Sequence, residues 1–274
     1  MDDHQFRLLL NHFGLSWRGY RRVRKGVKKR IRRHMKALGY KDFEAYLMAM
    51  DNDKTLRAKC EVLMTVSISR FFRDRGFWVT LENQILPEII HGNRERVKVW
   101  FAGCACGEEV FSFTILWDRL RDRFKALPEL KVLATDMNLA YLERAQLGLF
   151  SLSSLKEVPA DMRTRYFKRQ EKANQYRIAS SLEWGISWRP HHLLHDPPDR
   201  SFHLIFLRNN LLTYYEEALK APAFEKVVDC LVPGGLLIIG SHEKLPLETS
   251  DLLPYRGCPY VFQSRDLSKK MTNK

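Results

Sequence analysis

Four apolar runs from residue 97 onward have the length and continuity of strands that are buried on both faces of a sheet. They cover residues 97–102, 130–134, 202–207 and 236–240, and helical patterns at 108–123 and 216–231 lie between them. Strands that alternate with helices in this way form a mostly parallel sheet. Residues 76–264 are therefore predicted to form a doubly wound α/β domain, with the Pro-Gly-Gly segment 232–235 as a tight turn before the last strand.

Helical patterns dominate residues 1–75. Residues 41–50 and 54–64 have helix-forming composition, and the polar residues 51–53 separate them. Ahead of them an apolar stripe recurs at helical spacing: Val23, Val27, Ile31, Met35 and Leu38. We expect a small all-helical domain here. At the other end, residues 265–274 are polar and aperiodic, which predicts a disordered tail.

Small or polar residues follow three of the predicted strands. Gly103 opens a loop of small residues after the first strand, Asp136 ends the second, and Arg208 and Asn209 end the third. Ligands of parallel sheets bind at the carboxyl ends of the strands, so these residues mark one candidate site. A carboxylate at the position of Asp136 is suited to accept hydrogen bonds from both hydroxyls of a ribose.

The loop at Gly103 lacks the features of a phosphate site. It contains neither a Gly-x-Gly-x-x-Gly pattern nor a P-loop lysine, and Glu108 and Glu109 at the start of the next helix would repel phosphate. These carboxylates suit a cationic ligand with an amino group. S-Adenosylmethionine, which carries a sulfonium and an α-ammonium, is such a ligand.

Five segments occur in the order seen in one enzyme family. They are Ser67-Ile-Ser-Arg-Phe-Phe-Arg73, Gly103-Cys-Ala-Cys-Gly-Glu-Glu109, Ala134-Thr-Asp136, Arg208-Asn209 with Tyr214, and Pro233-Gly-Gly235 through Gly240-Ser-His-Glu243. In these segments the chain resembles the CheR-type methyltransferases, which have the Rossmann-like class I fold and methylate glutamate side chains of bacterial chemoreceptors with S-adenosylmethionine. The resemblance covers roughly residues 5–262.

The resemblance also bears on the irregular stretch 151–187. Residues 161–169 favour a helix and residues 176–179 a strand. The family inserts a small β-subdomain at this place, and some members use it to bind the C-terminal peptide of a receptor. We expect such a β-subdomain within residues 151–187.

Roles for individual residues follow from the resemblance. Around the cofactor it implies Ser67, Ser69 and Arg73 beside the methionine part, Gly103 in the loop, Glu108 or Glu109 at the ammonium, Asp136 at the ribose, His192 and Leu193 near the adenine, and Arg208 and Asn209 as further lining. For the methyl acceptor it implies that Arg73 holds a carboxylate with its planar guanidinium. Tyr214 then positions the acceptor oxygen or closes over the methyl group.

Several positions depart from the family pattern. His192 stands where asparagine is usual, Ala105 lies in the glycine loop, and His203 replaces an aspartate. The family tyrosine often lies five residues after the arginine of Arg-Asn, where this chain has Thr213, and a shifted turn would put Tyr214 in that role. The departures place the chain in a divergent branch of the family.

Positive charge is concentrated near the N-terminus. The formal net charge is +14, and residues 18–41 contain twelve Lys or Arg and no Asp or Glu. Like charges packed this densely repel one another, which favours an acidic partner over a merely solvated face. In the CheR family a basic N-terminal helix is thought to face the acidic, helical methylation region of the receptor. Nucleic acid is a second candidate, and an anionic membrane surface is disfavoured because the helix lacks a bulky Trp, Phe or Leu face.

Composition argues against other classes of protein. The five cysteines are odd in number and lack C-x-x-C spacing, so neither a disulfide framework nor a metal site is expected. No apolar run approaches the roughly 20 residues that span a bilayer, and the N-terminus lacks a secretory pattern. We therefore expect a cytoplasmic protein.

The leading hypothesis is an S-adenosylmethionine-dependent O-methyltransferase that acts on glutamate side chains of a protein and releases S-adenosylhomocysteine. One alternative keeps the cofactor and changes the acceptor to a small carboxylic acid or to RNA. The other is a non-catalytic regulator that binds the cofactor and docks on acidic partners. His192 and Thr213 motivate this last hypothesis.

Overall fold

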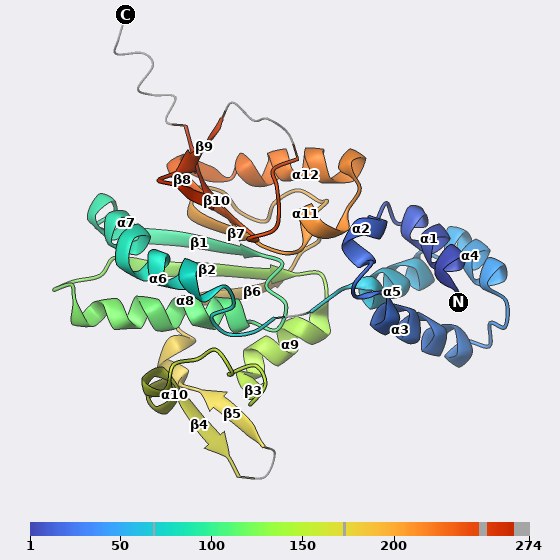
Figure 1. Ribbon diagram of the computed structural model, residues 1–274, viewed down its shortest axis with the longest axis horizontal. Helices are drawn as coiled ribbons and strands as arrows, with labels where there is room; N and C mark the ends of the chain where they lie inside the picture. Colours follow the sequence, from blue (N-terminus) through green and yellow to red (C-terminus); the bar gives the residue numbers. More distant parts are fainter. Residues whose placement is uncertain (68, 172–173, 247–250, 266–274) are drawn as a thin grey trace, which may run out of the picture.

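The structure is a computed structural model that describes residues 1–67, 69–171, 174–246 and 251–265. Apart from Arg265, the predicted disordered tail lies outside these residues. Figure 1 shows a helical N-terminal part, a central sheet with helices on both faces, and a small second sheet. Within the described residues, no helix has both the length and the apolar character needed to cross a membrane.

Seven strands form the central sheet in the order β6-β2-β1-β7-β8-β10-β9. The first five are parallel, and β10 is antiparallel to both of its neighbours. Their bounds are β1 Arg96–Ala102, β2 Glu129–Asp136, β6 Ile186–Pro190, β7 Phe202–Leu207, β8 Leu231–Ile239, β9 Leu252–Tyr255 and β10 Cys258–Ser264. The predicted α/β fold with a mostly parallel, doubly wound sheet is confirmed. The apolar pattern does not predict β6, β9 and β10, because these strands are only partly buried.

Helices cover both faces of the sheet. Successive residues of a strand point to opposite faces, so the sheet packs against a layer of helices on either side. Phe101 and Phe206 stack with ring centroids 4.3 Å apart on the face covered by α8, where Phe113 meets them edge-on. Trp100 points to the other face and packs in the layer that contains Phe224 of α12. The helices of this domain are α6 (Arg75–Thr80), α7 (Leu86–Gly92), α8 (Glu108–Arg119), α9 (Leu139–Leu147), α11 (Leu211–Tyr214) and α12 (Glu217–Val228).

The order in which the chain adds strands to the sheet reverses at β1. From β1 the chain builds outward through β2 to β6 on one side and through β7 to β8 on the other. At such a switch point the connections leave the carboxyl ends of adjacent strands in opposite directions, which opens a crevice there. The N-terminal helices lie against this edge of the sheet (Figure 1).

The N-terminal part has a core of its own. Its helices are α1 (Asp3–His12), α2 (Trp17–Tyr20), α3 (Arg24–Ala37), α4 (Phe43–Asn52) and α5 (Lys54–Met64). Val27, Ile31 and Met35 of the predicted stripe are buried in α3, whereas Leu38 is 50% exposed just after the helix. Asp53 separates α4 from α5 as expected, because its carboxylate caps α5 by accepting from the amides of Thr55 and Leu56.

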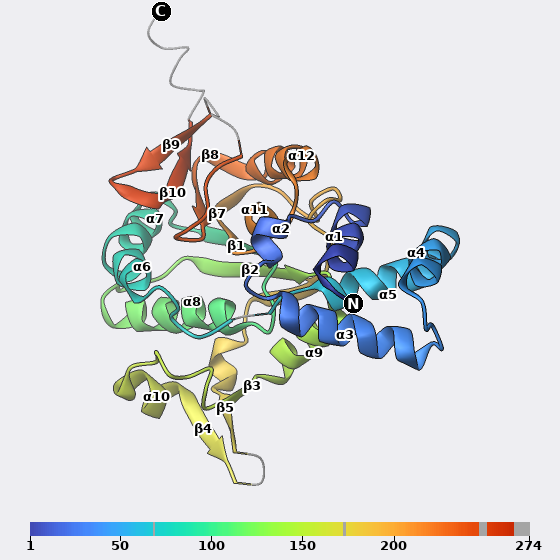
Figure 2. The same ribbon diagram turned by 45° about the vertical axis from the view of Figure 1, so that its right-hand side comes forward.

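Contact between the two parts is made by α2 and α11, which lie side by side in both views (Figures 1 and 2). The amide of Ser16 donates to the carbonyl of Tyr214 at 2.8 Å, and the amide of Glu216 donates to the carbonyl of Gly14 at 2.9 Å. A Cβ at Gly19 would lie 2.1 Å from the carbonyl oxygen of Thr213, so glycine is required for this approach. The segment between α5 and α6 connects the parts, and its Phe71 and Phe72 are buried, as are Phe77 and Trp78 in α6.

The prediction for residues 216–235 is wrong in two respects. The helix ends at Val228, and Pro233, Gly234 and Gly235 lie inside β8 rather than in a turn. The pairing of β7 with β8 begins at Phe202 and Leu231 and then shifts register. A Cβ at Gly235 would lie 2.9 Å from one carbonyl oxygen and 3.0 Å from another, so the glycine allows the strand to continue through an irregular stretch.

The irregular region forms a three-stranded sheet in the order β3-β5-β4 (Figure 1). Its elements are β3 (Leu149–Ser151), α10 (Ala160–Tyr166), β4 (Phe167–Gln170) and β5 (Gln175–Ile178). The predicted strand is present, but the predicted helix 161–169 ends at Tyr166 because the residues after it pair with β5.

Candidate functional site

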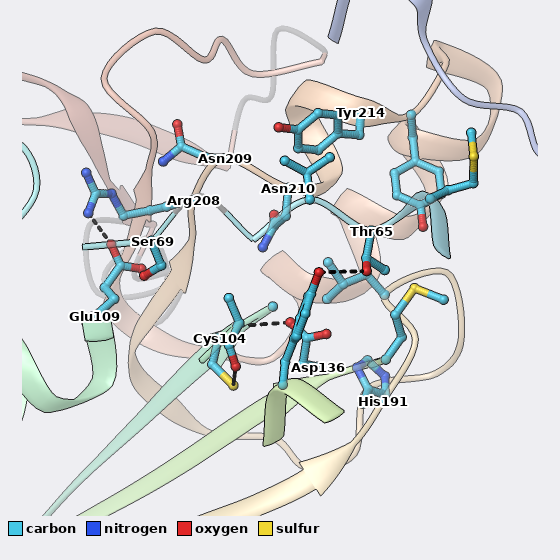
Figure 3. Close-up of a pocket in the computed structure, with 18 of the residues that line it drawn as sticks. Thr65, Ser69, Cys104, Glu109, Asp136, His191, Arg208, Asn209, Asn210 and Tyr214 are labelled. Carbon is cyan, nitrogen blue, oxygen red and sulfur yellow. Dashed lines mark hydrogen bonds and ion pairs between the residues drawn. The ribbon is translucent and has the colours of Figure 1, made fainter. Parts of the chain in front are cut away.

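A pocket lies at the carboxyl ends of β1, β2, β6 and β7, where the N-terminal part meets the sheet (Figure 3). Both parts of the chain line it. Leu15, Tyr20, Glu61 and Met64 come from the N-terminal helices and the loop between α1 and α2, and Thr65, Val66, Ser69, Arg70 and Arg73 come from the connecting segment. Gly103, Cys104, Ala105, Glu109, Asp136, Met137, Tyr141, His191, Leu193, Arg208, Asn209, Asn210, Tyr214 and Tyr215 complete the lining.

Most of the predicted site residues meet in this pocket. Ser69, Arg73, Gly103, Glu109, Asp136, Leu193, Arg208, Asn209 and Tyr214 line it. Ser67, Glu108 and His192 are not among the lining residues. The carboxyl ends of the strands thus bring together residues that are far apart in the sequence, as the strand pattern predicts.

The loop after β1 is fastened to the end of β2. The amides of Gly103 and Cys104 donate to the carbonyl of Thr135 at 2.9 and 2.8 Å. Gly103 has φ +86°, and a Cβ there would lie 2.2 Å from the side-chain nitrogen of Asn210. Ala105 also has a positive φ, 48°, which a residue with a Cβ rarely adopts. The loop therefore brings backbone close to any ligand in the pocket, at the cost of strain at Ala105.

Asp136 is held in place by backbone amides. Its Oδ2 accepts from the amide of Ala105 and its Oδ1 from the amide of Asn138, both at 2.9 Å. Burial raises the pKa of Asp136, and these hydrogen bonds partly offset the rise. Each carboxylate oxygen has two lone pairs, so the fixed carboxylate can accept two further hydrogen bonds from neighbouring hydroxyls.

A cluster of charges around the buried Arg208 lies beside the same pocket. The Arg208 side chain is 2% exposed and pairs with Glu109 and, at 2.5 Å, with Oδ2 of Asp74. Its guanidinium also lies 4.9 Å from the ring centroid of Phe77. One arginine against two carboxylates leaves a formal charge of about −1, which favours a cationic group beside Glu109.

The two adjacent glutamates point to different places. Glu109 lines the pocket, whereas Glu108 is 5% exposed and accepts a hydrogen bond from the hydroxyl of Ser154 at 3.3 Å. Burial raises the pKa of Glu108, and hydrogen bonds from Ser69 and Ser154 lower it in part. Of the two predicted partners for an ammonium, Glu109 is the one within the pocket.

The side chains of the adjacent residues Tyr214 and Thr213 also lie in different places. The ring of Tyr214 lies in the pocket and packs against Tyr20 with centroids 5.0 Å apart. Burial raises the pKa of Tyr214, while the positive charge of Arg73 acts against the rise. The Thr213 hydroxyl donates to Glu243 at 2.6 Å, outside the pocket lining. The turn of α11 therefore presents the tyrosine, and not Thr213, to the pocket.

His192 does not line the pocket itself, but it contacts Glu61, which does. Its Nε2 lies 3.0 Å from Oε1 of Glu61, and its Nδ1 accepts from the amide of Leu194 at 3.2 Å. Glu61 and the neighbouring His191 line the pocket, and His192 does not.

Several pocket residues have no clear signal in the sequence. Tyr20, Glu61 and Thr65 come from the helical part and its connection, and only the packing of the two parts brings them to the site. Asn210 donates to the carbonyl of Ala102 and accepts from the amide of Leu211. Its position directly after Arg208-Asn209 is the one signal that points to it.

The cysteines are all free thiols: Cys60, Cys104, Cys106, Cys230 and Cys258. Within the described part of the chain, no group of three or more His, Cys, Asp and Glu is placed to hold a metal ion. Burial raises the pKa of the Cys106 thiol to about 11, so the loop cysteine stays protonated at neutral pH.

Known proteins resemble this chain over most of its length. Residues 67–261 match the family model for the CheR methyltransferase, SAM binding domain. A chemotaxis protein methyltransferase of Listeria innocua is 31% identical over 239 residues, covering 87% of this chain and 88% of its own, and one of Listeria monocytogenes is 30% identical with the same coverage. Among solved structures, the N-methyltransferase NodS from Bradyrhizobium japonicum with S-adenosyl-L-homocysteine has 18% identity and a TM-score of 0.34, with 63% of each chain covered.

The range matched by the family model, residues 67–261, contains all five ordered segments. The match confirms S-adenosylmethionine as the cofactor. The chain belongs to the CheR family of S-adenosylmethionine-dependent methyltransferases.

Proposed function

We propose that the protein is a cytoplasmic enzyme that transfers a methyl group from S-adenosylmethionine to glutamate side chains of an acidic, helical protein of the chemoreceptor type. The observation that carries this proposal is a basic groove beside the cofactor pocket. Arg18, Arg21, Arg22 and Arg24 line the groove, and it shares Asn209 and Tyr215 with the pocket. An acidic segment in the groove would therefore reach the place where the methyl group is presented.

Only part of the basic segment 18–41 lines the groove, and we expect the acidic substrate to dock on this part. Arg24 and Lys28 are paired with Asp3, and Arg30 donates to the carbonyls of Leu63 and Thr65. Arg18, Arg21 and Arg22 are exposed in α2 and the turn after it. These three arginines are the part of the basic segment that is best placed to meet acidic side chains next to the pocket.

The strand order suggests how the cofactor lies. Glu109 and Arg208 lie on one side of Asp136 and His191 lies on the other, as Figure 3 shows. We place the ammonium of the cofactor at Glu109, its ribose at Asp136 and its base toward Leu193. Glu109 would then be shared between the ammonium and Arg208, and Asp74 would remain a second partner of the guanidinium.

The chemistry places modest demands on the side chains. When bound, the cofactor supplies a methyl group activated by the sulfonium. A glutamate carboxylate is ionised at neutral pH, so the acceptor oxygen needs no general base. A C–O bond forms as the C–S bond breaks, and the products are a methyl ester and the neutral sulfide. The protein must align the two reacting atoms and exclude water.

Arg73 and Tyr214 are the proposed groups for this alignment. The carbonyl of Arg73 accepts from the indole of Trp78 at 2.7 Å, which fixes the backbone of Arg73 at the pocket. Its guanidinium can hold one carboxylate oxygen while the other oxygen attacks. Tyr214 is a protonated phenol at neutral pH, and burial raises its pKa further, so it can donate a hydrogen bond or cover the methyl group.

The test is methyl transfer from labelled S-adenosylmethionine to a receptor cytoplasmic fragment, followed by mild alkaline hydrolysis. A carboxyl methyl ester releases its label as volatile methanol. Label that withstands base, or label found on RNA and not on protein, would contradict the proposal. We expect Arg73→Ala to abolish transfer, and full transfer by this variant would refute the acceptor role of Arg73.

A further inference from the structure

The end of the pocket beside β6 is where the strand order places the base of the cofactor. Glu109 lies in the first turn of α8, after the loop that follows β1, and Arg208 follows β7. Asp136 ends β2, and His191 and Leu193 follow β6. Neighbouring strands are about 4.8 Å apart, so an extended ligand with its ammonium at Glu109 and its ribose at Asp136 reaches the β6 side with its base.

Glu61 closes this end from the other part of the molecule. It belongs to α5 and lines the pocket, and its side chain is 27% exposed. The phenol groups of Tyr20 and Tyr215 lie near enough for the charge of Glu61 to raise the pKa of both, in addition to the larger effect of burial. Among the described residues, His192 is the only side chain that is hydrogen-bonded to the carboxylate of Glu61.

The hydrogen bonds of His192 fix the state of this pair. Its Nδ1 accepts from the amide of Leu194, so the ring proton is on Nε2 and is donated to Oε1 of Glu61. A neutral imidazole is sufficient for this arrangement. It leaves Oε2 and the second lone pair of Oε1 as acceptors, and within the described residues no further donor is hydrogen-bonded to them.

An acceptor-only carboxylate at the base end suits one feature of adenine, its exocyclic amino group. We propose that Glu61 recognises this amino group and that His192 is a positioning residue that holds Glu61 for it. The helical part of the chain thus supplies the residue that distinguishes adenine from a base with an oxo group at the same position. The inference depends on the orientation of the cofactor given above, and not on the identity of the methyl acceptor.

The test compares two ligands that differ at the amino edge of the base, where the change from amino to oxo also places a proton on the adjacent ring nitrogen. S-Adenosylhomocysteine carries the amino group, and S-inosylhomocysteine carries an oxo group, whose lone pairs would face the carboxylate of Glu61. Calorimetric titration of the full chain should show that the adenosyl ligand binds about 10 to 100 times more tightly. No methyl acceptor is present, so the result is independent of the proposed substrate.

The informative variant is Glu61→Gln. Its amide can turn to donate to the oxo group, so the preference should fall to within about threefold. Glu44→Gln makes the same change at an exposed position of α4 and should keep the wild-type ratio. His192→Ala should lower the preference by less than Glu61→Gln, because it frees Glu61 without removing the carboxylate.

A wild-type ratio in Glu61→Gln would overturn the proposal. If both ligands lose affinity equally and the ratio is kept, Glu61 only holds the two parts of the chain together. Glu109→Gln tests the orientation separately, since it should weaken both ligands by the same factor and leave their ratio unchanged.

Discussion

The arginines on the two sides of the pocket are held in opposite ways. On the cofactor side, Arg208 is 2% exposed and pairs with Glu109 and Asp74. On the acceptor side, Arg18, Arg21 and Arg22 are exposed, and within the described residues no ion pair joins them to an acidic side chain. On the proposed cofactor side, the chain pairs its arginine with carboxylates of its own. It leaves positive charge for a partner to balance where the substrate is proposed to dock.

This difference has an energetic basis. A buried charge that loses its partner costs several kcal/mol, whereas an exposed pair contributes about 0–1 kcal/mol and weakens with salt. Substitutions on the cofactor side should therefore lower the stability of the protein and its affinity for the cofactor. Substitutions on the acceptor side should lower only the affinity for the substrate.

The largest effect is expected for Arg208→Met. Glu109 and Asp74 would face each other without a cation, but their side chains keep 22% and 31% exposure and stay partly hydrated. We therefore expect a loss of about 2 to 3 kcal/mol in the free energy of unfolding, measured by urea denaturation. Arg22→Met is the matched control and should change stability by less than about 0.5 kcal/mol. Equal effects of the two variants would remove the contrast between the two sides.

Charge reversal on the acceptor side comes next. Arg18→Glu, Arg21→Glu and Arg22→Glu together should raise KM for an acidic receptor fragment about tenfold at low salt, with unchanged affinity for S-adenosylhomocysteine. The wild-type KM should rise with salt for the same reason. The control reverses Lys25, Lys29 and Arg33, which are exposed on α3 and do not line the groove. If both triple variants weaken the substrate equally, the groove has no special role.

A smaller effect concerns Glu108 and pH. Burial raises the pKa of Glu108 in the folded protein above its ordinary value of 4.5. The stability that this group contributes is complete below about pH 4.5 and is lost as the pH rises through the folded pKa. Glu108→Gln should remove this loss, so its stability relative to the wild type increases from acid to neutral pH. Two parallel profiles of unfolding free energy against pH would contradict the assignment.

The smallest effect is a gain. Ala105→Gly should raise the free energy of unfolding by about 0.5 kcal/mol, because glycine adopts a positive φ without strain. The larger conformational entropy of glycine in the unfolded chain offsets part of this gain. Ala102→Gly in the buried end of β1 should instead destabilise by about 1 kcal/mol. Thermal melts of both variants decide the point, and destabilisation by Ala105→Gly would show that the loop is not strained there.

The sequence predicts the cofactor side far better than the acceptor side. Buried strands produce continuous apolar runs, and the polar residues that end them, Asp136 and Arg208, mark the site directly. Glu61 and Tyr20 lie in helices whose pattern reports only burial within the N-terminal part, so their place in the pocket follows from how two parts pack. The choice of Tyr214 over Thr213 depends on the turn of α11, where the Thr213 hydroxyl is bound by Glu243.

The errors in secondary structure have the same origin. Partly buried strands such as β6 lack an apolar run, and Pro233-Gly234 predicts a turn where β8 continues irregularly. In both cases the strand forms because it pairs with a strand that is distant in the sequence, and a local sequence pattern carries no information about that pairing.

The most direct test of the central claim is calorimetric titration of the wild type and of Asp136→Ala with S-adenosylmethionine and S-adenosylhomocysteine. The carboxylate of Asp136 is fixed by two backbone amides, and its loss should lower affinity for both ligands about 100-fold. That result would place the ribose at the end of β2 and support the orientation on which the roles of Glu109 and Glu61 depend. Equal affinity in the variant and the wild type would contradict the claim that the pocket between the two parts holds the cofactor.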